Sequence, residues 1–135
     1  MEDLESTYWQ DEPIGVRNRK LGNRGEIAAS YYLELIGYDI VDRNWTCPAG
    51  EADIIAWDEE CLVFCEVKTR TSLEKGFPCE AITKKKRRKY ELIAAWYLKD
   101  HDYFDIPIRF DVIDLLVVAS DRAMIRHLKN AFGVF

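Results

Sequence analysis

The stretch from Gly50 to Arg70 constrains the fold most, because it sets charged side chains in line with large apolar ones. Residues 51–57 and 61–69 are short runs rich in Ile, Val, Phe, Cys and Trp, separated by a polar gap. This pattern is typical of two strands of a β-hairpin. Side chains alternate between the faces of a strand, so acids and apolar residues share one face of each. These shared faces carry Glu51, Asp53, Ile55 and Trp57 on the first strand, and Leu62, Phe64, Glu66 and Lys68 on the second.

The gap predicts the register of the hairpin. If residues 59–60 form a two-residue turn, Asp53 faces Glu66 and Glu51 faces Lys68, while a slip of two residues makes them diagonal neighbours on the same face. Like charges opposite each other are destabilising, so Asp53 and Glu66 need a cation between them, or one must hold a proton. Carboxylate oxygens suit Mg²⁺ or Mn²⁺. Lys68 either neutralises the cluster or contacts a substrate phosphate. The alternative is a half-exposed hairpin whose charges only face water.

The net charge of −5 is concentrated at one end of the chain. Residues 1–13 carry five of the 24 acids and no base, which leaves 19 acids against 19 bases in the rest. Residues 1–16 show no sustained period, so we expect a flexible acidic arm followed by a single domain over 17–135. A neutral body with clustered bases can still bind phosphate locally.

The cysteines and the apolar runs bear on the cellular compartment. No C-x-x-C spacing occurs, so the cysteines are interpreted as reduced thiols of a cytoplasmic protein. A zinc site made from Cys47, Cys61, Cys65 and Cys79 is the alternative. No run approaches the roughly 18 apolar residues of a membrane helix, and the acidic N-terminus lacks the basic and apolar regions of a signal peptide. We therefore expect no membrane partner.

The segments before the hairpin predict a helix and a strand. Residues 22–36 show the apolar spacing of one buried helical face, and residues 38–45 are strand-like. Glu26 lies at the edge of the apolar stripe and is expected to point towards the sheet. Alternatively, this acid in the first turn only complements the helix dipole.

A second helix is predicted over residues 83–99, with Thr83 as its cap. Its first turns hold six consecutive bases, which oppose the helix dipole and therefore favour a bound polyanion. Lys86 and Lys89 fall on the apolar helical stripe, which sets Lys86 inward and leaves the other four more outward, and a solvated basic face is the alternative. The six bases are Lys84, Lys85, Lys86, Arg87, Arg88 and Lys89.

The end of the chain completes the expected order of elements. Residues 108–118 predict a strand with Asp111 on the face of Ile113 and Leu115, and residues 121–131 a short helix. The fold class is thus α/β, a mixed central sheet flanked by helices, in the order α-β-β-β-α-β with a short C-terminal helix.

Several kinds of chemistry have little support in the sequence. Neither of the two glycine-rich phosphate-binding loop patterns is present, and His101 and His127 lie in polar regions without a recognisable partner. A carboxylate cluster with a lysine and a neighbouring basic surface fits metal-assisted hydrolysis of a phosphodiester.

At these residues the chain resembles the bacterial YraN family of predicted nucleases. The resemblance covers roughly residues 21–116, and the pairing of Gly-Glu-x-Asp with Glu-Val-Lys-Thr-Arg is specific. That family is similar to archaeal Holliday-junction resolvases and to the restriction-endonuclease-like fold. The motifs are Gly22-x-x-Gly25-Glu26, Gly37-Tyr38, Arg43-Asn44, Gly50-Glu51-x-Asp53, Glu66-Val67-Lys68-Thr69-Arg70, Glu80-Ala81-Ile82-Thr83 and Arg109-Phe110-Asp111-Val112.

The resemblance also implies roles for individual residues. Asp53 and Glu66 would be ligands of Mg²⁺ or Mn²⁺, and Lys68 would orient the attacking water or stabilise the phosphorane. Glu26 would complete the site, and Lys86 would contact a phosphate, with Arg70 and the other bases of the run extending a DNA interface.

The implied substrate is branched or otherwise structured DNA. A homodimer is expected by analogy with resolvases, which must address two strands. The alternative function is a nucleic-acid-binding or assembly module of the same fold without hydrolytic activity.

Overall fold

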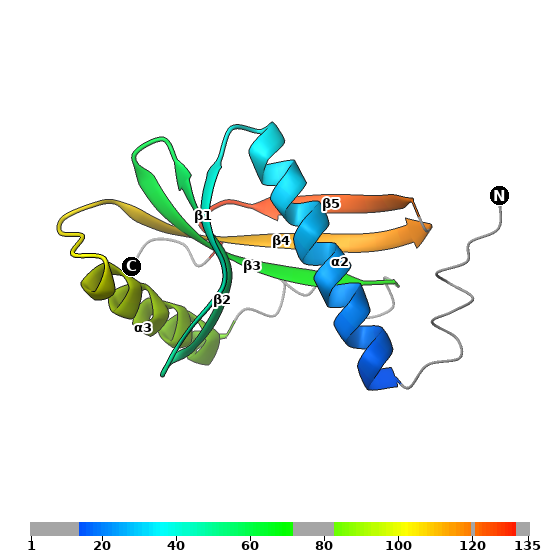
Figure 1. Cartoon of the computed structure of the whole chain (residues 1–135), viewed down its shortest axis with the longest axis horizontal. Helices are drawn as coiled ribbons and strands as arrows, with labels where there is room; N and C mark the ends of the chain where they lie inside the picture. The colour runs from blue at the N-terminus through cyan, green and yellow to red at the C-terminus, as the bar shows by residue number, and fades with distance from the viewer. Residues whose placement is uncertain (1–13, 72–82, 120, 132–135) are drawn as a thin grey trace.

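The computed structural model describes residues 14–71, 83–119 and 121–131, which form two helices and one sheet (Figure 1). Most of the expected acidic arm lies outside the described residues. No helix among them combines the length and the hydropathy needed to cross a membrane. The elements are α2 (Ile14–Leu35), β1 (Asp39–Cys47), β2 (Gly50–Asp58), β3 (Cys61–Arg70), α3 (Lys84–Asp100), β4 (Ile108–Ala119) and β5 (Arg122–Leu128).

The sheet has five strands in the spatial order β1-β2-β3-β4-β5. Every neighbouring pair is antiparallel except β3 and β4, which run parallel. A parallel pair needs a crossover connection, and the connection between β3 and β4 contains α3. The expected mixed sheet flanked by helices is therefore confirmed.

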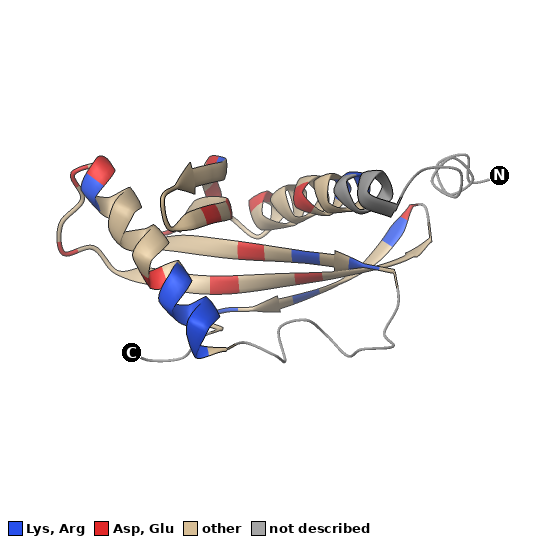
Figure 2. Cartoon of the chain, turned by 90° about the horizontal axis from the view of Figure 1, so that it is seen from below, with Lys and Arg blue, Asp and Glu red and all other residues tan. Residues whose placement is uncertain are grey.

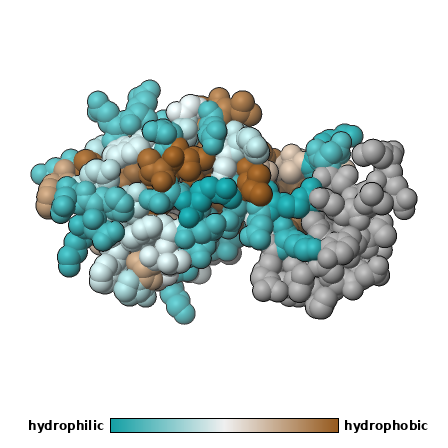
Figure 3. Space-filling view, viewed as in Figure 1, coloured by the Kyte–Doolittle hydropathy of each residue, from teal (hydrophilic) through white to brown (hydrophobic). Residues whose placement is uncertain are grey.

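The two helices cover opposite faces of the sheet. Ile54 and Ala56 of β2 pack in the cluster under α2, whereas Ile55 between them packs under α3. The α2 cluster also contains Leu33 of the helix, and the α3 cluster contains Tyr97. On the face that is seen in Figure 1, the surface is mostly hydrophilic, with separate hydrophobic patches (Figure 3).

The helix α2 begins earlier than expected, at Ile14 instead of residue 22. Its end agrees with the sequence prediction, because Gly37 adopts a φ of +98°. The Tyr38 N–H donates to the Leu33 carbonyl at 2.9 Å and the Gly37 N–H to the Glu34 carbonyl at 3.1 Å. This pair of bonds is the Schellman arrangement, which favours glycine at that position.

The predicted hairpin register is confirmed. The pairs run from Asp58–Cys61 to Ile54–Cys65, and Glu59 in the two-residue turn has a φ of +54°. The next pair in this register would be Asp53–Glu66, but the ladder stops one residue before it.

The predicted C-terminal helix is wrong, because Arg122–Leu128 forms the strand β5, antiparallel to β4. Ala, Met, Arg and Leu favour helices locally, but backbone pairing with the buried strand β4 outweighs that weak preference. The pairing also gives His127 partners that the sequence did not reveal. Its Nε2 lies 2.8 Å from Asp111 Oδ2, and its Nδ1 lies 2.9 Å from the Tyr32 hydroxyl.

Candidate metal centre

A bend in β2 at Asp53 creates the site. In the register of β1 and β2 Asn44 falls opposite Asp53, and Asn44 has a φ of +53°. On the other side, Asp53 Oδ2 accepts a hydrogen bond from the Val67 N–H of β3 at 2.8 Å. The Asp53 carboxylate therefore binds the backbone of β3 beyond the end of the regular ladder of β2 and β3.

The bend also breaks the alternation that the sequence predicted for β2. Ala52 and Ile55 are three residues apart, yet both pack in the cluster under α3. Strict alternation would put them on opposite faces. The prediction that Glu51, Asp53 and Ile55 share one face is thus wrong at this end of the strand. Glu51 and Asp53 instead line a cleft.

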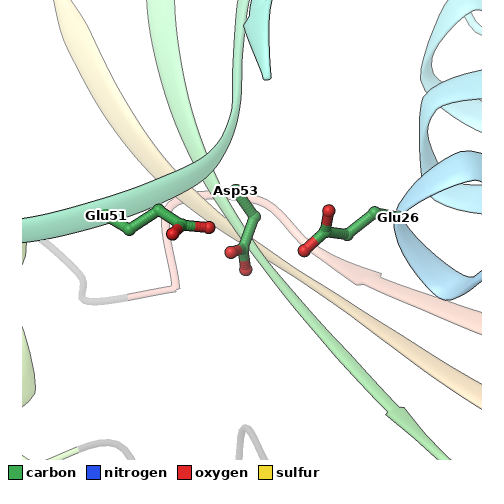
Figure 4. A group of neighbouring side chains, drawn as sticks. All are labelled: Glu26, Glu51 and Asp53. Carbon is green, nitrogen blue, oxygen red and sulfur yellow. The ribbon is translucent and has the colours of Figure 1, made fainter. Parts of the chain in front are cut away.

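Three carboxylates converge in this cleft. Glu26 reaches it from α2, and Glu51 and Asp53 reach it from β2, with Asp53 between the other two (Figure 4). One ligand oxygen of each lies within 4.8 Å of the others. This spacing and these hard oxygen donors suit a divalent cation such as Mg²⁺ or Mn²⁺.

Glycine at position 25 brings Glu26 to the cleft. A Cβ atom at Gly25 would lie 1.8 Å from Oγ1 of Thr69 and 2.8 Å from its Cβ. Only a residue without a side chain therefore lets α2 approach β3 this closely. The next residue of the helix is Glu26, so the close approach sets the position of the acid.

Glu66 faces the same cleft but has other partners. It is 8% exposed, and its Oε1 lies 3.1 Å from Lys68 Nζ and 2.8 Å from Lys86 Nζ. Lys68 comes from β3 and Lys86 from α3, so the carboxylate of Glu66 ties the two elements together. The cleft holds about 380 Å³. The residues that line it are Leu21, Gly22, Glu26, Glu51, Asp53, Glu66, Val67, Lys68, Thr69, Lys89 and Tyr90.

Two acids of the cleft, Asp53 and Glu26, have pKa values above those of ordinary carboxyl groups. Burial raises the pKa of Asp53 to about 6, and repulsion from the other carboxylates adds to it, against the hydrogen bond from Val67. Burial also raises the pKa of Glu26, while a hydrogen bond from Asn44 lowers it and repulsion from Glu51 raises it. A divalent cation among these oxygens would relieve both the burial and the repulsion.

The basic run begins α3, as predicted, and Figure 2 shows it as the blue first turns of that helix. Thr83 caps the helix by accepting from the Lys86 N–H at 3.2 Å. Lys86 turns inward to Glu66, as predicted. Arg87, which was expected outward, is half-buried, and its Nε lies 3.9 Å from Oε1 of Glu91. Lys89, which falls on the predicted stripe, is exposed at the rim of the cleft. The residues Lys84, Lys85 and Arg88 are exposed.

The structure thus brings together the predicted residues Glu26, Asp53, Glu66, Lys68 and Lys86. Arg70 follows at the end of β3, half-buried. Sequence reasoning did not include Glu51 among the candidate metal ligands. The Gly-Glu-x-Asp motif could have indicated Glu51, but strict alternation predicted that Glu51 faces Lys68 across the hairpin.

The cysteines form no comparable group in the part of the chain that the structure describes. Cys47 and Cys61 are half-buried and Cys65 is buried, while Cys79 lies outside the described residues. Among the described residues, the cluster of Glu26, Glu51 and Asp53 is the only group of three or more His, Cys, Asp or Glu side chains close enough to share an ion.

Comparison with known sequences places the chain in a family. The sequence model described as "Uncharacterised protein family UPF0102" matches residues 25–115, from α2 to β4, and so contains the whole cleft except its helical rim at Leu21 and Gly22. The chain belongs to the UPF0102, or YraN, family. This confirms the resemblance that the motifs carried.

Relatives in several bacteria match most of the chain. A UPF0102 protein of Renibacterium salmoninarum is 43% identical over 111 residues, which are 82% of this chain and 94% of the relative. One from Geobacter sulfurreducens is 44% identical over 123 residues, covering 89% and 96%. One from Caldicellulosiruptor saccharolyticus is 40% identical over 118 residues, covering 87% of this chain and all of the relative. The family description names no reaction.

Proposed function

We propose that this UPF0102 protein is a Mg²⁺- or Mn²⁺-dependent endonuclease that hydrolyses phosphodiesters in branched or otherwise structured DNA. The observation that carries the proposal is the convergence of Glu26, Glu51 and Asp53 in a cleft that also holds a lysine-bound carboxylate. The run of six basic residues at the start of α3 borders the same cleft through Lys89.

The cleft residues divide into those that hold a cation and those that handle the phosphate. Glu26, Glu51 and Asp53 would hold the ion, which polarises a phosphate oxygen and lowers the pKa of a water molecule. Lys68 orients the attacking water or stabilises the charge of the phosphorane. Lys86 would contact a neighbouring phosphate, and Glu66, which now binds Lys68 and Lys86, would be a further ligand of the ion once these lysines turn to the DNA.

The substrate class rests on sequence resemblance and on charge. The motifs are similar to those of archaeal Holliday-junction resolvases, which act on branched DNA, and a homodimer that addresses two strands is part of the proposal. The exposed bases Lys84, Lys85 and Arg88 would supply phosphate contacts beside the cleft.

Cleavage of labelled four-way junction, flap and blunt duplex DNA tests the proposal. We expect cleavage in Mg²⁺ or Mn²⁺ that is absent in EDTA, and a loss of at least about 100-fold in Asp53→Ala and Lys68→Ala. Tyr31→Ala is the matched control, because this exposed side chain lies on α2, away from the cleft. No cleavage, or cleavage that survives Asp53→Ala, would contradict the enzyme.

A second candidate is a nucleic-acid-binding module without hydrolysis. The observation that favours it is the pair of salt bridges that already satisfy Glu66. Both candidates predict DNA binding that falls steeply with salt. They differ in the divalent cation, because the module binds DNA equally well in EDTA and leaves every substrate intact in Mg²⁺ and Mn²⁺.

A further inference from the structure

The outward face of α3 carries two adjoining grooves that the proposed reaction does not use. The first holds about 490 Å³ and lies between the β1–β2 turn at Ala49 and the first turns of the helix. The second holds about 150 Å³ and lies along the later turns. Leu92 lines both of them. The further lining residues are Thr83, Lys85, Lys86, Arg88 and Lys89 in the first groove, and Ala95, Trp96 and Lys99 in the second.

The first groove adjoins the cleft of the candidate metal centre at Lys89. Lys89 lines both hollows, and Lys86 lines the groove while its Nζ is bound to Glu66. Gly50 permits this arrangement, because a Cβ atom there would lie 2.5 Å from Cε of Lys89. A nucleic-acid strand that leaves the cleft over Lys89 would therefore enter the groove directly.

The path changes in chemistry along its length. The part next to the cleft is lined by four cations, which suits phosphate groups. The far part has Trp96, which is 43% exposed, with Lys99 Nζ 5.8 Å from the centre of its ring. An exposed indole beside a cation offers a flat surface for a nucleobase and a charge for the adjoining phosphate. Bases of an intact duplex are stacked on each other, so such a surface serves an unpaired strand.

The helical spacing makes this a continuous path. Residues 85, 88, 89, 92, 96 and 99 recur every three or four positions, which places them on one side of a helix. Lys85 and Trp96 are separated by about 16 Å along the axis at the rise of an α-helix. At about 3.4 Å per stacked nucleotide, this length takes four or five nucleotides.

We propose that the α3 grooves bind an unpaired nucleic-acid strand that leads out of the cleft, with its phosphates on Lys85, Arg88 and Lys89 and one base stacked on Trp96. The direction of the strand rests on the proposed endonuclease function. The proposal adds to that function a preference for DNA with a single-stranded segment beside the cleaved bond, such as a flap or a splayed branch.

Fluorescence anisotropy in EDTA tests the stacking contact without any cleavage. The probes are a labelled 12-nucleotide single strand and a blunt duplex of the same sequence. We expect Trp96→Ala to weaken binding of the single strand by about 10-fold, within the roughly 5- to 150-fold that one stacked base contributes. Binding of the duplex should change less than twofold. Trp96→Phe should retain most of the affinity, and Tyr31→Ala, an exposed aromatic on the opposite face, should match the wild type.

Tryptophan fluorescence provides a readout that a purely structural role of Trp96 would not give. The single strand should quench emission of the wild type, and Trp96→Phe should lose this quenching while it still binds. For the phosphate contacts, we expect the double variant Lys85→Gln and Arg88→Gln to reduce the slope of log affinity against log salt by about 1.4. Equal losses on single strand and duplex in Trp96→Ala, or no binding of the single strand, would overturn the proposal.

The outcomes separate this proposal from the endonuclease itself. Cleavage of junction DNA that is unaffected in Trp96→Ala, together with unchanged single-strand affinity, overturns the grooves and leaves the enzyme. Stacking on Trp96 without any cleavage in Mg²⁺ or Mn²⁺ supports the grooves and overturns the enzyme. A change of sedimentation coefficient in Trp96→Ala with unchanged DNA binding would assign the grooves to a contact between copies of the chain, and would overturn the proposal.

Discussion

At the scale of single residues, Asp53 shows the cost of burying an acid among other acids. Its carboxylate is buried beside Glu26, Glu51 and Glu66, and its pKa is raised to about 6. The sequence predicted that Asp53 needs a cation or a proton, because an acid opposite it on the next strand would repel it. The repulsion is present, and it comes from Glu26 and Glu51 as well as from Glu66.

We expect Asp53→Asn to stabilise the metal-free protein at pH 8 by on the order of 2 kcal/mol. The folded pKa is raised, so ionised Asp53 costs stability above about pH 6, and that cost shrinks as the pH falls towards the unfolded value of 3.8. Urea unfolding in EDTA at pH 8 and pH 5 measures the difference. The increase in the free energy of unfolding of Asp53→Asn over the wild type should be smaller at pH 5 than at pH 8. An equal increase at both pH values would contradict burial and repulsion of the ionised carboxylate as its cause.

At the scale of elements, Gly25 decides how closely α2 lies on β3. We expect Gly25→Ala to destabilise the protein by about 1–3 kcal/mol, because the new Cβ meets Thr69 and the helix must move. Displacement of α2 should also weaken divalent cation binding through Glu26. Gly22→Ala is the matched control in the same helix, because nothing lies within 4 Å of a Cβ there. That control should be neutral or up to about 1 kcal/mol more stable.

A fall in stability of Gly22→Ala equal to that of Gly25→Ala would contradict this account of α2. Thermal unfolding and Mn²⁺ titration of both variants provide the measurements.

A buried acid of β4, Asp111, adds side-chain contacts to the backbone pairing that holds β5 in the sheet. Asp111 is 1% exposed and accepts hydrogen bonds from Arg109, from Tyr38 and from the backbone N–H of Asn130, and it contacts His127. Burial alone would raise its pKa, but His127 and Arg109 outweigh it and hold the pKa near 2. The network therefore joins β5 and the end of α2 to β4.

We expect Asp111→Ala to cost about 3–5 kcal/mol at pH 7, because Tyr38, His127 and the Asn130 N–H lose a buried partner, although Arg109 keeps its ion pair with Asp58. The folded pKa is depressed, so the contribution of Asp111 is complete above about pH 4 and is lost as the pH falls towards 2. The difference between wild type and variant in urea unfolding should shrink over that window. A difference independent of pH between 5 and 2.5 would contradict the ionic role.

At the scale of the whole molecule, the sequence predicted the elements whose pattern is local. The alternation of β2 and β3 predicted the hairpin and its register, and Gly37 predicted the end of α2. The strand β5 could not be predicted, because its residues prefer a helix and only the edge of β4 makes them a strand. The partners of His127 were hidden for the same reason, since Asp111 lies 16 positions away in the chain.

The candidate site also combines residues that a local sequence pattern predicts with one that it does not. Asp53, Glu66 and Lys68 lie on neighbouring strands, so side-chain alternation and motif brought them together. Glu51 was missed because the positive φ of Asn44 and the bend at Asp53 break the period of two. Neither feature has a signal in the pattern of apolar residues.

The proposed function requires Glu26, Glu51 and Asp53 to hold one divalent cation together. Isothermal titration calorimetry of the wild type and Glu51→Gln with Mn²⁺ tests it most directly, because Glu51 joins the group only through the fold. We predict one equivalent of Mn²⁺ per chain in the wild type and affinity at least about 10-fold weaker in Glu51→Gln, with Glu34→Gln on α2 as the unaffected control. Binding of Mn²⁺ that is equal in Glu51→Gln and the wild type would contradict the claim.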